Sequence, residues 1–375
     1  MNILIAPNSF KECADSVKIA QIISRALAQT KHNLIIKPLT DGGDGFLSVI
    51  QSIFEVETLK FPLKNCYDEN YSDYIVLYER KHKQVFVESA ELFGLKIIPP
   101  EKRNPSKLNS SILGELLIKL AQQVESNNIE IENVCIGIGG TATIDFAIGA
   151  LTKLGLELYD EKNNLFEALP IHFNQVAKIE NKINPLPFSV SCIVDVDTPL
   201  IGNPGSIEIY GNQKGAVDAE LKIIKDGINN ILHLLNKDSQ FQIKDKLNGS
   251  GGGFGAGFEA VLNTKLISAE MFIKDFILND VVINNVDVVI TGEGNFDFQS
   301  FEGKGVGTLL NIFTESQIPI FIICGISKIT DEVLLNENIH IIKFSDYFEN
   351  VESSIKNFET GILKSVESIC NLLHK

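Results

Sequence analysis

Residues 286–297 read VDVVITGEGNFD, an apolar run that ends in a segment of glycine and acidic residues. The start of the chain follows the same plan, because residues 2–11 read NILIAPNSFK. In both places an apolar pattern with helical spacing follows, over about residues 16–29 and 306–316. Apolar strands that alternate with helices are typical of a parallel sheet covered on both faces. Both ends of the chain therefore predict parts of a doubly wound α/β domain.

The alternation continues outward from these two segments. Further strands are predicted at 34–37, 318–324 and 340–344, and further helices at 46–54, 331–337 and 351–373. The middle of the chain differs, because three short runs between residues 56 and 88 favour an antiparallel meander. We therefore expect two domains: a doubly wound domain from residues 1–65 and 285–375, and an inserted mixed α/β domain over 66–284.

The composition is that of an ordinary globular chain with a strong negative charge. Of 375 residues, 44% are hydrophobic and 22% are charged, and the formal net charge is −15. A chain this acidic is a poor binder of nucleic acid and of anionic membranes. The first residues lack the basic and apolar regions of a signal peptide. We expect a cytoplasmic protein that binds neither nucleic acid nor membranes.

Glycine-rich loops follow several of the predicted strands. At the carboxyl ends of parallel strands, helix N-termini present N–H groups to anions. The segment 137–145, GIGGTATID, has this strand–turn–helix setting, which favours a ligand-binding turn; close packing of helix on strand is the alternative. The glycine cluster at 249–257 allows a ligand to approach the backbone closely, or it forms a connector.

Acidic and basic residues stand beside other loops. Asp195 and Asp197 follow a predicted strand and suit Mg²⁺ ligation or a base for a hydroxyl proton. The DGGDG segment at 41–45 offers further oxygen ligands, and Ser9 and Lys11 in the first loop are candidates for a phosphate or carboxylate contact. Each loop also has an ordinary interpretation as a turn or a helix entry. Together, carboxylates, lysines and N–H cradles are the parts that phosphoryl transfer requires.

The order of these motifs resembles the glycerate kinase type 1 family. In chain order, the motifs here are APNSFKECADS, DGGDGF, GIGGTATIDFA, DVDTPLIGNPG with YGNQKGA, GGGFGAG, and ITGEGNFD with GK. In the same order, the family has APDSFKGSLSA, DGGEGT, GIGGSATNDGG, DVxNPLxGPxGA with FGPQKGA, GGLGAG, and ITGEGRID with GK. The resemblance implies ATP-dependent phosphorylation of D-glycerate with Mg²⁺, giving 2-phosphoglycerate. It also implies a flavodoxin-like domain made from both chain ends and a central domain likened to a restriction-endonuclease fold.

The chain departs from the family pattern at several positions. Asn8 stands for Asp, Ile144 for Asn, Phe146 for Gly, Thr198 for Asn, Asn212 for Pro and Asn295 for Arg. An arginine is suited to bidentate contact with carboxylate or phosphate, and isoleucine donates no hydrogen bond. These changes keep two alternatives open: a kinase of another small hydroxy acid, and a non-catalytic nucleotide-binding regulatory protein.

Motifs and resemblance together assign roles to individual residues. The catalytic candidates are Asp195, Asp197 and Lys11. The substrate-binding candidates are Ser9, Arg103, Gly139, Gly140, Thr141 and Asp145, with Arg103 in a bidentate grip on the carboxylate or as a solvated loop residue. The candidates for binding ATP are Gly292, Glu293, Gly294, Asp297, Lys304 and Gly253, and those for Mg²⁺ are Asp41, Asp44 and Asp195. The expected partner is the small acid, with a homodimer as a further possibility.

Overall fold

The computed structural model describes residues 1–11, 13–68, 70–194, 198–301, 305–313, 316–329 and 337–373. Contacts between residues divide the chain into two compact units. The first unit consists of residues 1–41, 48–54 and 268–375, and the second of residues 42–47 and 55–267. The sequence analysis set the boundaries at 65/66 and 284/285, and helix α2 (Phe46–Ile53) is shared between the two units.

A five-stranded parallel sheet forms the centre of the first unit. Its order is β13-β12-β11-β1-β2, with strands β1 (Asn2–Ile5), β2 (Asn33–Ile36), β11 (Val288–Phe296), β12 (Ile320–Ser327) and β13 (Ile339–Lys343). Counted along this unit, the order is 2-1-3-4-5, that of flavodoxin-like folds. The predicted fold class is therefore confirmed: a flavodoxin-like, doubly wound domain from both chain ends, with a mixed α/β domain inserted.

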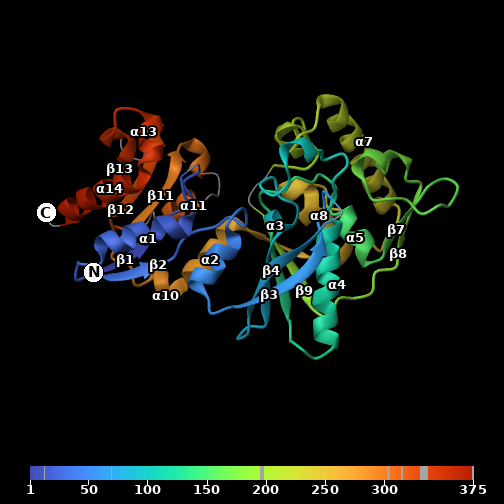
Figure 1. The fold of residues 1–375 in the computed structure, drawn as a ribbon, viewed down its shortest axis with the longest axis horizontal. Helices are drawn as coiled ribbons and strands as arrows, with labels where there is room; N and C mark the ends of the chain where they lie inside the picture. Colours follow the sequence, from blue (N-terminus) through green and yellow to red (C-terminus); the bar gives the residue numbers. More distant parts are fainter. Residues whose placement is uncertain are drawn as a thin grey trace. The chain divides into compact units, whose positions relative to one another are not determined.

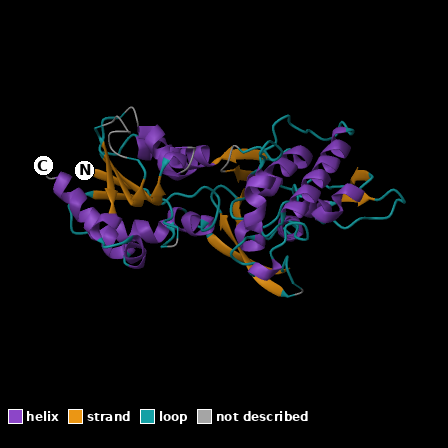
Figure 2. Cartoon of the chain, turned by 90° about the horizontal axis from the view of Figure 1, so that it is seen from above, coloured by secondary structure: helices purple, strands orange, loops and turns teal. Residues whose placement is uncertain are grey.

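Helices cover both faces of this sheet (Figure 2). On one face, α1 (Ser16–Leu27) packs beside α14 (Phe358–Leu373), and both ends of the chain lie in this unit (Figure 1). Asp15 begins α1 because its carboxylate accepts a hydrogen bond from the N–H of Lys18 at 2.7 Å. The apolar face of α1 then meets the strands in a core that includes Ile19, Ile23 and Ile290. On the sequence, this face appears as the apolar residues at helical spacing.

The remaining helical segments of the first unit are short, apart from α11. They are α9 (Ala269–Met271), the π-helix η4 (Phe272–Leu278), α10 (Asn279–Ile283), η5 (Phe298–Phe301), α11 (Gly305–Phe313), η6 (Phe344–Tyr347) and α13 (Val351–Lys356). Among the helices of the described ranges, none combines the length and the apolarity that crossing a bilayer requires.

The second unit is built on a six-stranded sheet of order β10-β9-β6-β5-β4-β3. Its strands are β3 (Glu57–Lys64), β4 (Tyr71–Glu79), β5 (Gln84–Glu88), β6 (Asn133–Gly137), β9 (Ser189–Val194) and β10 (Lys265–Ser268). The first three form the predicted antiparallel meander, whereas β5, β6 and β9 run parallel. The carboxyl ends of these three strands therefore lie at one edge of the sheet.

Helices of the second unit pack around a large apolar core. They are α3 (Ser89–Phe93), η1 (Pro100–Lys102), α4 (Ser111–Glu125), α5 (Ile148–Leu154), η2 (Pro170–Gln175), α6 (Ser206–Gly211), η3 (Asn212–Lys214), α7 (Asp218–Asn236) and α8 (Ser250–Leu262). Helices α4 and α5 lie side by side (Figure 1) because Gly114 leaves room for the backbone of α5. A Cβ atom at Gly114 would lie 2.4 Å from the carbonyl oxygen of Ala150.

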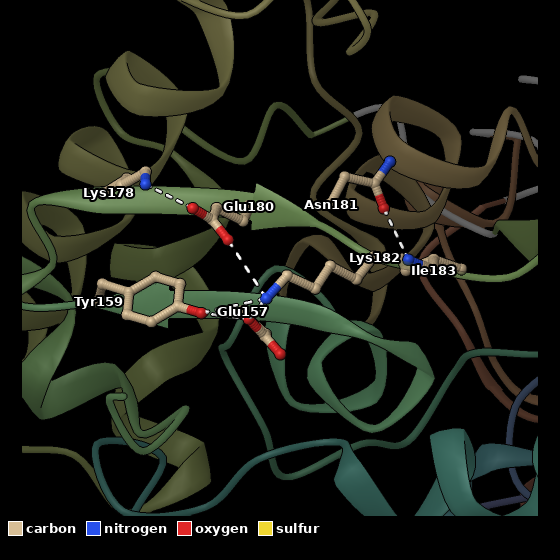
Figure 3. A network of polar contacts seen from close by, with 7 residues as sticks. All are labelled: Glu157, Tyr159, Lys178, Glu180, Asn181, Lys182 and Ile183. Carbon is tan, nitrogen blue, oxygen red and sulfur yellow. Dashed lines mark hydrogen bonds and ion pairs between the residues drawn. The ribbon is translucent and has the colours of Figure 1, made fainter. Parts of the chain in front are cut away.

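A separate two-stranded sheet, β7 (Leu156–Tyr159) and β8 (Lys178–Asn181), carries a network of exposed charges (Figure 3). The Lys182 ammonium group contacts Glu157 at 2.5 Å and Glu180 at 3.3 Å, and Lys178 also contacts Glu180. Solvent screens such pairs, so each adds little to stability. The network joins Glu157 of β7 to Glu180 of β8 through Lys182.

Two segments differ from the sequence-based expectations. Residues 292–296 were expected to form a glycine-rich loop, but they continue β11 and pair with β12 as far as Ser327. Position 292 in the sheet requires glycine, because a Cβ atom there would lie 2.0 Å from the carbonyl oxygen of Ile323. The helix expected from residue 144 begins only at Ile148.

The delay in α5 comes from two residues in the left-handed region. Phe146 has φ 51° and Ala147 has φ 58°. Glycine adopts this conformation at little cost, whereas a bulky side chain rarely does. The family pattern DGG at these positions reads DFA here, so this chain keeps the turn and accepts local backbone strain. Both side chains are fully buried in the apolar core, which offsets that strain.

The first turn of α2 is held by a carboxylate from another strand. Glu88, the last residue of β5, accepts hydrogen bonds from the N–H groups of Gly45 at 2.8 Å and Leu47 at 3.0 Å. These N–H groups have no partners within the helix, since they lie at its start. Burial raises the pKa of Glu88 to about 6, although the two N–H donors oppose that rise.

We predict that Gly114→Ala lowers the free energy of unfolding by about 1–3 kcal/mol, because the new methyl group overlaps the α5 backbone. That cost exceeds the gain in helix propensity, about 1 kcal/mol. Urea denaturation measures the effect. The control is Gln122→Ala on the exposed side of α4, which should change stability by less than about 0.5 kcal/mol. Equal stabilities of the two variants would contradict the observed helix packing.

We predict that Glu88→Ala lowers the free energy of unfolding by about 2 kcal/mol at pH 7, because two partly buried N–H groups lose their acceptor. The pKa of Glu88 is raised on folding, so its contribution is largest below pH 4.5 and falls as the pH rises to about 6. The difference between wild type and variant should therefore be up to about 2 kcal/mol larger at pH 4.5 than at pH 7. Glu125→Ala, at the exposed end of α4, is the control and should change stability by less than about 0.5 kcal/mol at either pH.

Candidate functional site

The glycine-rich loop after β6 packs directly against the DGGDG loop. The N–H of Gly139 donates to the carbonyl oxygen of Gly42 at 3.1 Å. A Cβ atom at Gly139 would lie 2.6 Å from the Cα of Gly43, so any side chain there would separate the two loops. Gly140 has φ 72° and lies beside the carboxylate of Asp44. The second unit thus brings Gly139, Gly140 and Asp44 together.

A buried lysine holds the far side of this loop. The ammonium group of Lys214 donates hydrogen bonds to Thr141 Oγ1 at 3.2 Å and to the carbonyl oxygen of Thr143 at 2.9 Å. Burial lowers the pKa of Lys214 to about 8, and the charge of Asp145 partly opposes this shift. The sequence analysis did not select Lys214 as a site residue. The YGNQKG segment at 210–215 was the available signal, but a basic residue beside a glycine is usually a solvated one.

Asp145 supports the loop from within the protein. Its Oδ2 atom accepts hydrogen bonds from the N–H and Oγ of Ser110, at 2.8 and 2.7 Å, and from the N–H of Gly149 at 3.1 Å. The residue is fully buried, and desolvation raises the pKa of its carboxyl group. Its Oδ1 atom has no hydrogen-bond partner among the described residues. Asp145 therefore joins the starts of α4 and α5 to the loop.

A cavity of about 170 Å³ opens beside Lys214 and Thr141 within the second unit. Its lining residues are Leu95, Gly139, Gly140, Thr141, Ile144, Ser206, Tyr210, Gln213, Lys214, Gly249, Ser250, Gly251 and Gly252. Three of the predicted substrate-binding residues, Gly139, Gly140 and Thr141, are among them, whereas Asp145 is not. The cavity offers hydroxyl groups and one buried cation to a small ligand, and an apolar wall formed by Leu95 and Ile144.

Three consecutive glycines bring the start of α8 against the same cavity. Gly251, Gly252 and Gly253 all have positive φ, at 62°, 72° and 81°. A Cβ atom at Gly252 would lie 2.2 Å from the carbonyl oxygen of Thr143, and one at Gly253 would lie 2.7 Å from Leu200. The predicted residue Gly253 therefore allows close packing behind the cavity wall.

Arg103 lies next to the Lys214 segment through its backbone. Its carbonyl oxygen would be 2.2 Å from a Cβ atom at Gly215, which has φ 96°. The Nε of Arg103 donates to the carbonyl oxygen of Ile98 at 2.9 Å, and the side chain is half-buried. Arg103 is not one of the residues that line the cavity. The bidentate carboxylate grip expected for it stays a prediction.

A second group of predicted residues gathers in the first unit, at the carboxyl ends of β1 and β11. The N–H of Asn8 donates to the carbonyl oxygen of Gly292 at 2.8 Å, and Asn8 Oδ1 accepts from the N–H of Ser9. A Cβ atom at Gly294 would lie 3.2 Å from the backbone nitrogen of Lys11. Ser9, Lys11, Gly292 and Gly294 are therefore neighbours, with Lys11 exposed to solvent.

The acidic residues of β11 and the turn after it have local partners. Asn295, which stands where the family has arginine, donates from Nδ2 to Asp297 Oδ2 at 2.9 Å. The N–H of Asp297 donates to Ser300 Oγ at 3.1 Å, so this turn is well braced. Glu293 is half-buried within the strand. Asn295 thus makes one local hydrogen bond and supplies no cationic fork.

Several predicted residues cannot be located. Asp195, Asp197 and Lys304 lie outside the described residues. Of the other metal candidates, Asp41 is half-buried in the first unit, and Asp44 in the second forms an ion pair with Lys96 at 3.1 Å. Within the described ranges, His, Cys, Asp and Glu side chains form no group of three or more that could hold a metal ion. The Mg²⁺ ligands therefore stay a prediction.

The cysteines show no sign of nucleophilic chemistry. All six are free thiols, and burial raises the pKa of Cys66, Cys135 and Cys324 to about 12. A thiol is a nucleophile only as the thiolate, which these groups do not form near neutral pH.

Comparison with known proteins gives a consistent result over the whole chain. A glycerate kinase of Neisseria meningitidis is 31% identical to it, over 100% of this chain and 99% of that protein. A glycerate 2-kinase of Escherichia coli is 28% identical, over 99% and 95% of the two chains. A crystal structure from Salmonella typhimurium, assigned there as a glycerate kinase 2, shares the fold with a TM-score of 0.78 at 24% identity, and both chains are fully covered.

The family model gives the assignment. Residues 3–374 match the model described as the glycerate kinase family, which is almost the entire length of 375 residues. The flavodoxin-like sheet order, the glycine-rich loops and the cavity beside Lys214 all lie within the matched region. This chain belongs to the glycerate kinase family.

Proposed function

We propose that this protein is an ATP-dependent glycerate kinase that phosphorylates D-glycerate to 2-phosphoglycerate. The observation that carries the proposal is the small cavity beside Lys214, in a chain that matches the glycerate kinase family from residue 3 to residue 374. The name of the Escherichia coli relative, a glycerate 2-kinase, supports the regiochemistry. The order of motifs supports membership of the type 1 subgroup.

The size of the cavity favours the acid over the nucleotide as its ligand. Pockets for drug-sized ligands span roughly 300–1,000 Å³. The cavity beside Lys214 has about 170 Å³, which is too small for a whole nucleotide but suits a three-carbon hydroxy acid. We therefore assign ATP to the other group of loops, which contains Lys11, Gly292 and Gly294, together with Glu293, Asp297 and Lys304 as the sequence predicts. Gly253, which the sequence also predicts to bind ATP, belongs to the second unit and packs behind the wall of the cavity.

The reaction requires one bond to form and one to break. A hydroxyl oxygen of the acid attacks the γ-phosphorus of ATP, the bond from that phosphorus to the bridging oxygen breaks, and ADP leaves. We propose that Asp195 or Asp197 accepts the hydroxyl proton and that Lys11 and Lys304 neutralise charge on the phosphates. Thr141, Gly139 and Gly140 then hold the acid in position, which is a large part of catalysis in such transfers.

We propose Mg²⁺ as the metal that accompanies ATP. The carboxylates of Asp41, Asp44 and Asp195 are the hard oxygen donors that this ion prefers. The Asp44 carboxylate is open enough to accept a cation, since its side chain is 38% exposed and its partner Lys96 is a flexible surface residue. When bound, Mg²⁺ would reduce the negative charge of the phosphates.

One feature of the cavity favours a second candidate substrate. Ile144 lines the cavity where the family pattern has asparagine, and Leu95 adds to the same apolar wall. An apolar wall tolerates a hydrocarbon substituent better than a hydroxyl group that needs a partner. A kinase of another small hydroxy acid is therefore the alternative, and a homodimer is compatible with either substrate.

We predict that the purified protein releases ADP in the presence of ATP, MgCl₂ and D-glycerate, as measured by a coupled assay. Phosphorus NMR of the product should show the resonance of 2-phosphoglycerate. A panel that includes lactate and 2-hydroxybutyrate at fixed ATP tests the alternative. Faster turnover of an acid with a hydrocarbon substituent would favour the second candidate, and no turnover of any acid would refute both.

We predict that Asp195→Asn lowers kcat for D-glycerate by about 100-fold or more, because the hydroxyl proton loses its acceptor. Removing the metal with EDTA should abolish turnover in the wild type, and added MgCl₂ should restore it. The control is Asp226→Asn on the exposed surface of α7, which removes one negative charge from the chain and should leave kcat unchanged. An Asp195→Asn enzyme with wild-type kcat would exclude this residue as the base.

A further inference from the structure

The unusual feature of the cavity is a buried lysine with no anionic contact among the residues that the structure describes. Only 6% of the surface of Lys214 is exposed. Among the described residues, no carboxylate lies within the 4.0 Å of an ion pair with its ammonium group. A buried charge is costly unless it is paired, so lysine is rarely kept at such a position without a partner.

The contacts of Lys214 leave part of its ammonium group free. An ammonium group carries three N–H donors. Two of them reach Thr141 Oγ1 and the carbonyl oxygen of Thr143, both of which are neutral acceptors. For the third donor, the described residues offer no hydrogen-bond partner. Because Thr141 and Lys214 both line the cavity, a ligand there can reach this donor.

The surrounding groups cannot supply the missing negative charge by direct contact. Asp145 influences Lys214 through its charge, but its carboxylate is turned to Ser110 and Gly149. Within the described ranges, the other titratable groups around the cavity are the phenol of Tyr210 and the carboxylate of Asp44, which lies beside Gly140. The Asp44 carboxylate forms an ion pair with Lys96 at 3.1 Å and none with Lys214. The cavity thus presents one cation and several neutral donors to a ligand.

We propose that the ammonium group of Lys214 binds the carboxylate of the acid substrate, and that this contact selects an acid over a neutral polyol. This inference rests on the proposed function, because it takes the cavity as the site of the acid. A carboxylate oxygen would accept the third N–H of Lys214, with the hydroxyl of Thr141 beside it. Lys214 is a specificity-determining residue in this scheme, since the reacting hydroxyl lies elsewhere on the substrate.

The proposal leads to a characteristic pH dependence. The free enzyme holds Lys214 with a pKa of about 8, and the carboxylate binds only the ammonium form. Affinity is therefore retained below pH 8 and lost above it, by about tenfold for each pH unit. Binding at pH 8.5 also takes up a proton, which appears as a dependence of the binding enthalpy on the buffer.

The test compares Lys214→Met and Lys214→Arg with wild type, by calorimetry with D-glycerate alone and by steady-state kinetics. We expect Lys214→Met to weaken binding and to raise KM for D-glycerate by about 10- to 100-fold, with KM for ATP unchanged. Its KM should no longer vary between pH 7 and 9.5. The preference for D-glycerate over glycerol should fall by the same factor, and Lys214→Arg should restore part of it.

Two controls separate this effect from loss of structure. Thermal unfolding should show that Lys214→Met stays folded, because the loss of two hydrogen bonds is offset by the removal of a buried charge that has no ion-pair partner among the described residues. Lys222→Met removes an exposed lysine from α7 and should match wild type in KM and in pH profile. If Lys214→Met does not fold, the pH profile and the proton uptake of the wild type decide the question.

The outcomes distinguish this inference from the proposed function. A folded Lys214→Met enzyme with wild-type KM for D-glycerate overturns the inference and leaves the kinase intact. A rise in KM for ATP alone also overturns it, because Lys214 would then contact a phosphate. If the wild type binds D-glycerate through Lys214 but transfers no phosphoryl group, the inference stands and the proposed function fails. A wild type that neither binds nor phosphorylates D-glycerate overturns both.

Discussion

The close contact between two glycine-bearing loops is the constraint on which the candidate site depends. The loop after β6 touches the DGGDG loop without any side chain between them, since a Cβ atom at Gly137 would lie 2.5 Å from the carbonyl oxygen of Gly42. Larger residues would push the loops apart and would move Gly139, Gly140 and Thr141 away from Lys214. The close approach of the two backbones thus determines where the side chains of the site lie.

Several buried polar groups surround this contact. Asp145 joins three backbone and hydroxyl donors below the loop, Glu88 holds the start of α2, and Lys214 supports the loop from its other side. Buried polar groups cost free energy unless they are satisfied, and here most of their atoms are. Strain at Phe146 and Ala147 adds to that cost at the same loop. Strain and buried charge gathered in one place are typical of functional sites, where binding takes precedence over stability.

In the proposed reaction, one group of site residues binds ATP and the other binds the acid. The loops at the ends of β1 and β11 lie in a flavodoxin-like domain, whose strand ends commonly bind phosphate-bearing ligands. The cavity of the inserted unit is small and holds a buried cation, as suits a short acid. Two differences from the family pattern affect these groups. Asn295 stands in β11 in place of a cationic arginine, and Ile144 makes the cavity wall apolar.

Much of the fold could be predicted because its signals are local. Short stretches of sequence show the continuous apolar strands, the Asp15 cap of α1 and the order of the glycine-rich loops. These signals determined the doubly wound architecture, the insertion and the family. Only the tertiary structure decided that residues 292–296 are strand, that Asp145 serves as an internal support, and that Lys214 is buried with no carboxylate in contact among the described residues. Those properties depend on burial and on partners that are far apart in the chain, and a charged residue in a sequence does not show whether water or protein surrounds it.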